Sequence, residues 1–368
     1  MTVKIDLRRL WLRLTENIDS LLMSFILMLM LISLAVMFSA SGQDFAKTSS
    51  QMANMSVALL LMWLVAKVPP QHLARFALPV YILGLLLLVG VALFGDVSHG
   101  ARRWLNIGIR IQPSEMMKLA VPLMLAWYLD RREKTLNLKD FGVAVLMLVA
   151  PVGLIVRQPD LGTALLISAA GFYVLFLAGL SWRIILGLVG IGAASTPILW
   201  SLLHDYQRQR ILTLIDPSQD PLGTGYHIIQ SSIALGSGGI FGKGWLNGTQ
   251  AHLDFLPERT TDFIFAVYAE EFGLAGNLIL LALYVLVIGR GLVIAAKAPT
   301  LFSRLLAGSI TLTFFTYAFV NMGMVSGILP VVGVPLPLIS YGGTSMVTLL
   351  LGFGMLMSIQ THRKLVQS

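Results

Sequence analysis

The chain has 368 residues, of which 56% are hydrophobic and 12% charged, and it contains no cysteine. A water-soluble domain of this length cannot bury so much apolar surface, so the composition indicates a membrane protein. The missing cysteines exclude a disulfide framework and a thiolate metal site. A formal charge of +8 would suggest nucleic acid for a soluble protein. Here the basic residues lie mostly in short loops beside apolar runs, where they contact membrane lipids, and no nucleic-acid partner is expected.

Apolar runs recur along almost the whole chain, and most are near the length that crosses a bilayer as a helix. We interpret the first run as an uncleaved helix, because it is longer than a signal-peptide core and nine more runs follow it. The predicted fold class is an all-α polytopic membrane protein with about ten transmembrane helices, organised as one domain over residues 1–368. The expected spans are 21–39, 52–68, 76–95, 113–129, 141–157, 161–179, 182–203, 263–289, 305–326 and 340–359.

The distribution of Lys and Arg predicts the orientation of these helices. With the N-terminus in the cytoplasm, 16 basic residues lie inside and 10 outside. Four of those outside belong to the long segment 204–262, which the positive-inside rule discounts. Both termini are therefore expected in the cytoplasm, and 204–262 is expected to be a large, partly helical periplasmic loop. Twelve of the 18 carboxylates fall on that outer side. This concentration is expected for a protein that acts on a polar molecule at that face, and it is also expected for a solvated loop.

The first charged cluster on the outer side is "HGARRWLNIGIRIQPSEMMK". Glu115 and Lys118 are three residues apart, so they share one helical face inside an otherwise apolar segment. Ionisable groups inside a membrane are costly and are candidates for function, although a buried ion pair that only locks helix packing is the alternative. Trp104 precedes this helix, and a place in the interfacial aromatic belt is the simpler interpretation for a single Trp.

Two aspartates stand at the starts of predicted helices. In "RQPDLGTALL", Pro159 ends one helix and Asp160 begins the next, where capping and function are equally compatible with the pattern. In "FLPERTTDFIFA", Asp262 leads into the span 263–289. Partial burial would raise the pKa of Asp262 and make it a better proton acceptor, whereas an N-cap is again the alternative.

The segment 204–262 is too long for a simple connection between helices. Arg208 and Arg210 follow the seventh span, where two guanidiniums suit a phosphate or pyrophosphate, with anchoring to anionic lipid as the alternative. The run "GSGGIFGKG" lacks the Gly-Lys-Ser/Thr ending of a nucleotide-binding loop, so we expect a flexible, close-packing loop there and no nucleotide site. The amphipathic run "GYHIIQSSIALGSG" predicts an ordered, partly embedded piece.

The last notable segment, "SGILPVVGVPLPLISYGGTS", is rich in glycine and proline and lies between the ninth and tenth spans. Irregular backbone at membrane depth is tolerated where it is buried in protein or lines a cavity. We therefore expect this segment to form one wall of a site.

Together, "HDYQRQRILTLIDPSQDPLGTGYHIIQSSIALGSGGIFGKGW", "FLPERTTDFIFAVYAEEFG", "GILPVVGVPLPLISYGGTSM" and "RQPDLGTALL" resemble the SEDS family (shape, elongation, division and sporulation). The resemblance runs from about residue 20 to the C-terminus, and "GKGWLNGTQAHLDFLPE" is similar to the rod-shape members more than to the division members. It implies an enzyme of the bacterial cytoplasmic (inner) membrane that polymerises lipid II into glycan strands during elongation. The implied partners are lipid II, the nascent strand, a class B penicillin-binding protein that crosslinks it and other elongation-complex proteins.

The resemblance also implies roles for individual residues. The essential acid of the family's TDF motif matches Asp262. The other matched positions, expected to bind or position the substrate, are Arg208, Arg210, Glu115, Lys118, Asp160 and Trp104. The chain departs from the pattern at Thr260, where many relatives carry His or Gln, which argues against an obligatory role for that position.

The implied reaction joins the 4-hydroxyl of an acceptor GlcNAc to a donor sugar carried on undecaprenyl pyrophosphate. Asp262 is expected to accept the hydroxyl proton, and Arg208 and Arg210 to bind the pyrophosphate. A single displacement would convert the α-linked donor into a β-1,4 product. Mg²⁺ or Mn²⁺, held partly by carboxylates, is compatible with this chemistry because hard cations bridge protein and phosphate oxygens, and the individual ligands are not assigned.

Two other functions are compatible with a polytopic chain of this kind. A transporter that flips lipid II would also use intramembrane charges and broken helices, although it needs access from both leaflets and these charges gather on one side. A non-catalytic activator of the penicillin-binding protein is the third possibility, and it predicts that Asp262 and Glu115 can be neutralised without loss of function.

Overall fold

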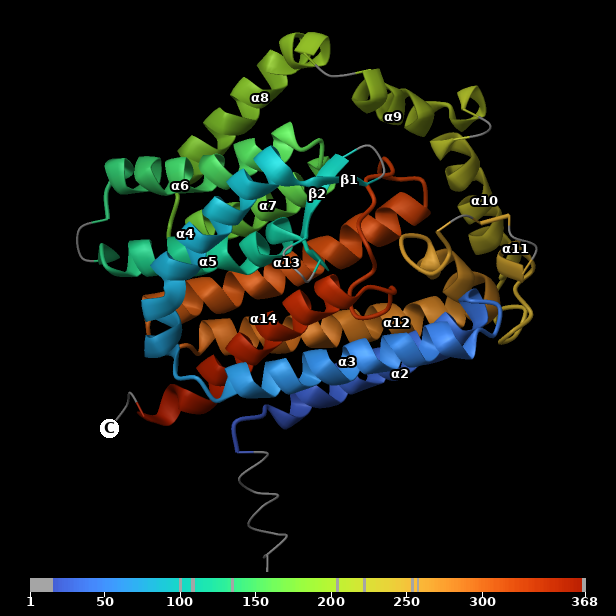
Figure 1. The fold of residues 1–368 in the computed structure, drawn as a ribbon, viewed down its shortest axis with the longest axis horizontal. Helices are drawn as coiled ribbons and strands as arrows, with labels where there is room; N and C mark the ends of the chain where they lie inside the picture. Colours follow the sequence, from blue (N-terminus) through green and yellow to red (C-terminus); the bar gives the residue numbers. More distant parts are fainter. Residues whose placement is uncertain are drawn as a thin grey trace, which may run out of the picture.

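The computed structural model describes residues 16–365 apart from 99–100, 107–109, 134–135, 203–204, 221–222, 253–254 and 257. Within this part, ten helices correspond one for one to the ten predicted spans (Figure 1). They are α2 (Ser20–Ala40), α3 (Phe45–Ala66), α4 (Pro70–Phe94), α5 (Pro113–Asp130), α6 (Leu138–Arg157), α7 (Leu161–Leu177), α8 (Trp182–Leu202), α12 (Ile264–Ala296), α13 (Leu301–Val325) and α14 (Gly343–Thr361). Seven of them are long and apolar enough to cross a membrane, and α7 and residues 182–197 of α8 are shorter apolar helices. The chain is a multi-pass membrane protein.

The helix ends differ from the predicted spans because capping, rather than hydropathy, sets them. Helix α3 begins at Phe45 instead of residue 52, and the side chain of Asp44 accepts hydrogen bonds from the main-chain nitrogens of Ala46 and Lys47 at its start. Helix α4 begins at Pro70, a residue suited to the first helical position. These polar first turns lie outside the apolar windows from which the spans were predicted.

The predicted all-α polytopic fold is confirmed, and the structure adds one small sheet to it. Strands β1 (Asp96–Ser98), β2 (Ala101–Asn106) and β3 (Arg110–Ile111) pair antiparallel in that order. The strands are too short to produce a recognisable alternation of apolar and polar residues. The sheet packs through β2 against α4 and α5, and it carries Arg103 and Trp104 to the start of α5.

The bundle is organised around α13, which packs against α5, α7, α12 and α14. Helix α14 lies along α3, and α4 lies along α5. In contrast, α8 rises away from the other long helices, as Figure 1 shows. Glycine-rich α8 therefore leaves much of its apolar surface outside the packed bundle, with Leu186 and Ile191 exposed.

The large loop is partly helical, as predicted. It contains α9 (Asp205–Ile215), the 3-10 turn η2 (Pro217–Gln219), α10 (Thr224–Ser237) and the short α11 (Thr249–His252). Helix α10 corresponds to the amphipathic run, and it buries Ile228 and Ala234 on the side that packs against α12.

The glycine-rich run after α10 packs closely against α12, also as predicted. A Cβ atom added at Gly242 would lie 2.0 Å from the carbonyl oxygen of Glu271, so only glycine fits there. Opposite this contact α12 is interrupted at Gly273, whose φ of 64° and ψ of −160° are accessible essentially to glycine alone. The main-chain nitrogen of Leu274 then donates to the carbonyl of Gly239 at 2.9 Å. The loop thus supplies hydrogen bonds that the broken helix lacks.

Candidate active site

Asp262 lies in the turn that leads into α12. The helix begins after Phe263, which occupies the N-cap position without a side-chain hydrogen bond, so the interpretation of Asp262 as a helix cap is wrong. The turn is closed instead by the carbonyl of Glu258, which accepts from the main-chain nitrogens of Thr261 and Phe263 at 3.0 and 3.2 Å. The Asp262 carboxylate, in turn, accepts no hydrogen bond from the described residues, so it is available to a ligand.

The surroundings of Asp262 set its proton affinity. Burial and then the negative charge of Glu258 raise the pKa of this half-buried carboxyl group, Arg103 lowers it, and the net result is a pKa of about 6. A carboxylate with a pKa close to neutral is a better proton acceptor than one with an ordinary value, and it is still ionised at neutral pH. The site therefore favours Asp262 as a general base.

The irregular segment between α13 and α14 forms a wall beside Asp262, as the sequence predicted. A Cβ atom added at Gly333 would lie 3.4 Å from Oδ2 of Asp262. The hydroxyl group of Ser340 donates to the carbonyl of Thr261 at 2.6 Å, and the main-chain nitrogen of Tyr341 donates to that of Thr260 at 2.9 Å. These bonds fasten the turn to the wall, so the position of Asp262 depends on both segments.

Thr260, the position that departs from the family pattern, has a structural contact of its own. Its side chain is buried, and its hydroxyl oxygen accepts a hydrogen bond from Nζ of Lys47 at 3.2 Å. The ammonium group of Lys47 also lies 5.8 Å from the ring centroid of Tyr341. Lys47 therefore brings a positive charge from α3 to the turn that carries Asp262.

Arg103 and Asp160 form the second part of the site. Nε of Arg103 lies 3.6 Å from Oδ2 of Asp160, and the same guanidinium donates to the carbonyl of Pro159 at 3.4 Å. Asp160 also caps α7, because its Oδ1 accepts from the main-chain nitrogen of Thr163 at 3.3 Å. The capping interpretation of Asp160 is thus confirmed, and the ion pair adds a second role. Arg103, with a third of its side chain exposed, acts on both Asp160 and Asp262.

Glu115 and Lys118 form the third part, in the first turns of α5. Their side chains are buried and paired, with Nζ of Lys118 2.5 Å from Oε1 of Glu115. The second carboxylate oxygen of Glu115 is buried without a hydrogen-bond partner among the described residues. The predicted pair is confirmed, whereas its role in function stays a prediction.

Tyr317 of α13 connects these parts. The ammonium group of Lys118 lies 5.0 Å from the centroid of its ring, and the ring packs with Val334 of the wall segment. Asp160 interacts electrostatically with the same tyrosine. The structure therefore brings Glu115, Lys118 and Asp160 together around Tyr317, and Arg103 connects this cluster to Asp262.

Trp104 lies next to Arg103 on β2, where its main chain pairs with Asp96. Its side chain is half-buried, at the same ends of the helices as Arg103 and Asp160. This position is compatible with the interfacial interpretation and with contact to a bound substrate.

Arg208 and Arg210 lie on α9, outside this cluster. The guanidinium of Arg208 donates to the carbonyls of Trp200 and Ser201 at 3.0 and 2.7 Å, so it binds the end of α8. It also lines a separate cavity of about 330 Å³, formed with Gln209, Leu212, Thr213 and Gln219. The structure does not bring the paired arginines into contact with Asp262 in the described part of the chain. Their proposed binding of pyrophosphate stays a prediction.

Sequence reasoning missed three residues of the site. Arg103 stood among several arginines in one motif, and no periodicity identified the one that meets the acids. Tyr317 and Asn321 lie inside a predicted span, where a buried amide among apolar residues is itself a signal of function or packing. The side-chain amide of Asn321 donates to the carbonyl of Asp262 at 2.8 Å.

An apolar groove of about 640 Å³ opens beside Glu115. It runs between α3, α4, α5 and α14. Gln112 and Gly343 lie at the end where α5 and α14 begin, and Leu123 and Met355 lie further along these helices. Long apolar cavities with a few polar groups at one end suit ligands that carry a hydrocarbon chain and a polar head.

A divalent cation would need several acidic or histidine ligands. Among the described residues, no group of three or more acidic or histidine side chains gathers closely enough to hold a metal ion. These residues therefore do not build a metal site from protein groups alone.

Similar proteins are known over nearly the full length of the chain. The family model described as "cell cycle protein", of the FtsW, RodA and SpoVE type, matches residues 16–365. The peptidoglycan glycosyltransferase MrdB of Escherichia coli K12 is 54% identical over 352 residues, which are 95% of each protein. A solved chain from a peptidoglycan synthase complex that coordinates polymerization and crosslinking has a TM-score of 0.82 and 32% identity, covering 94% of this chain and 98% of that one. RodA of Thermus thermophilus, a rod shape determining protein, has a TM-score of 0.72 and 31% identity, covering 94% and 97%.

Proposed function

This chain belongs to the SEDS family of cell cycle proteins, and we propose that it is a peptidoglycan glycosyltransferase that polymerises lipid II into β-1,4-linked glycan strands during cell elongation. The relative named peptidoglycan glycosyltransferase, at 54% identity, supports the reaction class. The observation that carries the chemistry is Asp262, whose carboxylate is free of hydrogen bonds to the described residues and has a pKa of about 6.

Asp262 acts as the general base in this proposal. It accepts the proton of the acceptor 4-hydroxyl while the hydroxyl oxygen bonds to the anomeric carbon of the donor. The bond from that carbon to the pyrophosphate oxygen breaks, and the lipid pyrophosphate leaves with the electron pair. One displacement inverts the α-linked donor to the β product. No protonated acid is needed at the leaving oxygen, in contrast to glycoside hydrolysis.

Arg103 is the side chain best placed to meet the charge of the leaving pyrophosphate. It adjoins Asp160 and acts on Asp262, whereas Arg208 binds the end of α8. A guanidinium binds phosphate oxygens in a bidentate manner, which fixes the donor relative to the base. Mg²⁺ or Mn²⁺ would supply further charge neutralisation, and such an ion would have to draw oxygen ligands from the pyrophosphate itself.

The hydrocarbon chain of lipid II is assigned to the groove beside Glu115. The lining of this groove is apolar along the helices, and its polar residues lie at the outer end where the sugar would sit. Glu115 and Lys118 then hold the outer end of α5 against Tyr317 and shape the space between the groove and Asp160.

A crosslinking enzyme, a class B penicillin-binding protein, is the proposed partner. Support comes from the similarity to a chain of a peptidoglycan synthase complex that coordinates polymerization and crosslinking. Other elongation-complex proteins are expected to join the same assembly. We place the chain in the bacterial inner membrane with both termini in the cytoplasm, on the basis of its Lys and Arg distribution.

The test is polymerisation of labelled lipid II by the purified protein, with and without the cognate penicillin-binding protein and with and without a chelator. We expect long glycan chains from the wild type and none from Asp262→Asn, which should still insert into the membrane and bind its partner. Asp44→Asn is the matched control, because Asp44 is an exposed acid on the same predicted face and Asn also caps helices. Normal polymer from Asp262→Asn would overturn the assignment of the base.

The same assay separates the two other functions. A lipid II flippase would move labelled lipid across proteoliposomes and make no polymer. A non-catalytic activator would raise crosslinking by its partner even when Asp262 and Glu115 are both neutralised.

A further inference from the structure

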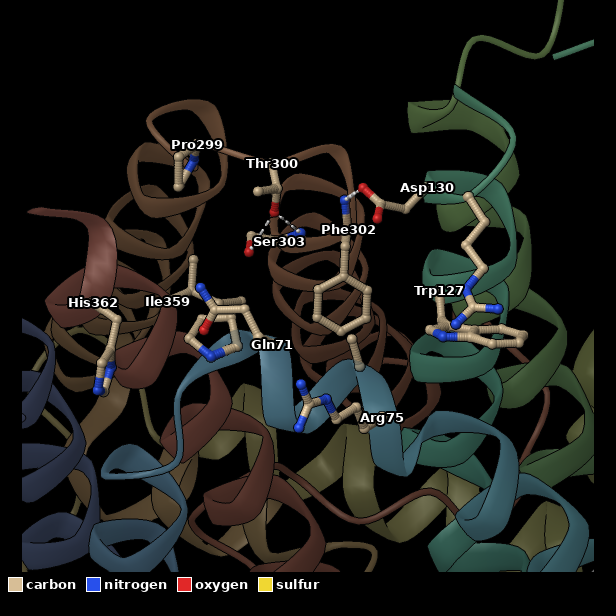
Figure 2. A pocket seen from close by; sticks show the side chains of 13 residues that line it. Gln71, Arg75, Trp127, Asp130, Pro299, Thr300, Phe302, Ser303, Ile359 and His362 are labelled. Atoms are coloured by element: carbon tan, nitrogen blue, oxygen red, sulfur yellow. Dashed lines mark hydrogen bonds between the residues drawn. The ribbon is translucent and has the colours of Figure 1, made fainter. Parts of the chain in front are cut away.

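A second polar cavity lies at the opposite ends of the helices that carry the site. It has a volume of about 260 Å³ and lies between the start of α4, the end of α5, the start of α13 and the end of α14 (Figure 2). The side chains that line it are those of Pro70, Gln71, Ala74, Arg75, Trp127, Asp130, Arg131, Pro299, Thr300, Phe302, Ser303, Ile359 and His362. The proposed chemistry on the outer side makes no use of this cavity.

Two arginines give this cavity a positive charge. The exposed guanidinium of Arg75 makes no hydrogen bond or ion pair with any described residue. The guanidinium of Arg131 is stacked on Trp127, with its carbon 4.3 Å from the ring centroid, and it donates no hydrogen bond within the described part. His362 uses Nδ1 toward the carbonyl of Ser358 at 3.0 Å, which leaves Nε2. The cavity therefore contains hydrogen-bond donors that no described residue accepts from.

The acidic side chain in the cavity is already engaged. Oδ1 of Asp130 accepts from the main-chain nitrogen of Phe302 at 2.8 Å, a contact drawn in Figure 2. The hydroxyl groups of Thr300 and Ser303 are hydrogen-bonded to each other at 2.9 Å. Asp130 forms no ion pair with Arg75 or Arg131, so no described residue neutralises the two positive charges by an ion pair.

The first turn of α4 also favours an anion in this cavity. Its N-cap is Pro69, which provides no side-chain hydrogen bond, and Pro70 and Gln71 of this turn line the cavity. The N-terminus of a helix carries partial positive charge and favours an anion. The partial charge of the helix end adds to the charge of the two arginines, which remain the main reason to expect an anion.

We propose that the cavity binds the phosphate group of an anionic phospholipid headgroup. Guanidiniums pair with phosphate oxygens in bidentate geometry, and basic pockets between transmembrane helices are characteristic sites for acidic headgroups. The location favours a lipid over a soluble phosphate, because the cavity lies at the ends of spanning helices and includes Trp127, a residue type enriched at the membrane interface. By the orientation inferred from charge, this is the cytoplasmic leaflet.

A bound headgroup would connect four helices. Helices α4, α5 and α14 also border the apolar groove beside Glu115, and α13 carries Tyr317. An anionic lipid is therefore expected to stabilise the arrangement of helices on which the groove depends.

The experiment compares the purified full-length protein in nanodiscs of neutral phosphatidylcholine and in nanodiscs that also contain phosphatidylglycerol. Bound lipid is counted by native mass spectrometry, and the thermal midpoint is recorded for each sample.

Arg75→Gln and Arg131→Gln are each expected to weaken phosphatidylglycerol binding about fivefold, with a larger loss in the double variant. Asp130→Asn should strengthen it, because a negative charge beside the phosphate is removed while an oxygen acceptor for Phe302 remains. The matched control is Arg183→Gln, an exposed arginine of the same predicted face outside the cavity.

The outcomes separate the possible sources of phosphate. Retention of phosphatidylglycerol by the wild type and by Arg183→Gln, with loss in the double variant, supports the proposal. Equal loss in Arg183→Gln would mean that general surface charge binds the lipid, which overturns it. Inorganic phosphate added to neutral nanodiscs serves as the probe for a soluble ligand, and a thermal shift equal to that of phosphatidylglycerol would overturn the lipid assignment. Circular dichroism and gel filtration establish that each variant is folded, and Arg75→Lys, which keeps the charge, should retain most of the binding.

Discussion

Asn321 holds Asp262 in place by the main chain rather than by the carboxylate. The amide nitrogen of this buried side chain donates to the carbonyl of Asp262 at 2.8 Å and to the carbonyl of Val334 at 2.7 Å. One side chain of α13 thus fastens both the turn before α12 and the wall segment, and it leaves the Asp262 carboxylate free. Asn321 is a positioning residue, because it acts on the reaction through Asp262.

Replacing Asn321 by Ala is expected to lower kcat by about 10- to 100-fold, because small displacements of a catalytic group are costly. The KM for lipid II should change little, since the groove and Arg103 are untouched. Two buried carbonyls lose their donor, so we also expect a loss of about 1–3 kcal/mol in the free energy of unfolding. Steady-state polymerisation kinetics and thermal unfolding check both. Ser326→Ala, which removes an exposed hydroxyl near the end of the same helix, is the control. A large KM effect with normal kcat would contradict the positioning role.

The pH dependence of polymerisation should report the ionisation of Asp262. Its pKa is about 6, raised by burial and by Glu258 and lowered by Arg103. The carboxylate is the active form of a base, so the rate is expected to fall as pH drops through about 6 and to level off above about 7. The measurement is the initial rate at saturating lipid II across this range.

The pyrophosphate of the substrate also titrates, and Glu258→Gln distinguishes the two groups. Removing this negative charge takes away an effect that raises the pKa of Asp262, so the acid limb should move to lower pH in this variant. An unmoved limb would assign the titration to the substrate.

A substitution at Arg103 tests where the pyrophosphate binds. Arg103→Gln should reduce kcat/KM by about tenfold or more, as expected for a lost charge-assisted hydrogen bond. Arg208→Gln should have a smaller effect, because its guanidinium is occupied by the carbonyls at the end of α8. Polymerisation rates of the two variants are compared at several lipid II concentrations. A greater loss in Arg208→Gln would place the pyrophosphate at α9, as the sequence first predicted.

The pair of Glu115 and Lys118 can be tested for a role beyond packing. Lys118→Met leaves a buried carboxylate without its partner and is expected to cost about 3–5 kcal/mol. Glu115→Gln combined with Lys118→Met removes both charges and should recover most of that stability. We expect the double variant to be folded but nearly inactive, as judged by thermal unfolding and polymer yield. Normal activity in the double variant would mean that the pair only stabilises helix packing.

Hydropathy predicted the ten helices, because the backbone of an apolar run inside a membrane must form its hydrogen bonds within that run. It did not predict where the helices begin, since Asp44 and Pro70 act through local geometry that carries no apolar signal. The short sheet before α5 escaped detection for the same reason, and with it the position of Arg103. The contact between Arg103 and Asp160 joins residues 57 positions apart, and the sequence pattern alone does not specify which of several arginines makes it.

The interruption of α12 at Gly273 ties membrane insertion of this helix to a segment made before it. When α12 enters the bilayer, the main-chain nitrogens of Leu274 and Ala275 have no acceptor within the helix until the carbonyls of Gly239 and Ile240 reach them. An unpaired amide in apolar surroundings costs several kcal/mol, so the helix is complete only after the loop has docked. Biogenesis of the eighth span therefore ends with docking of the large loop, and an epitope tag inserted at 239–244 should trap a protein that is threaded through the membrane but degraded before it matures.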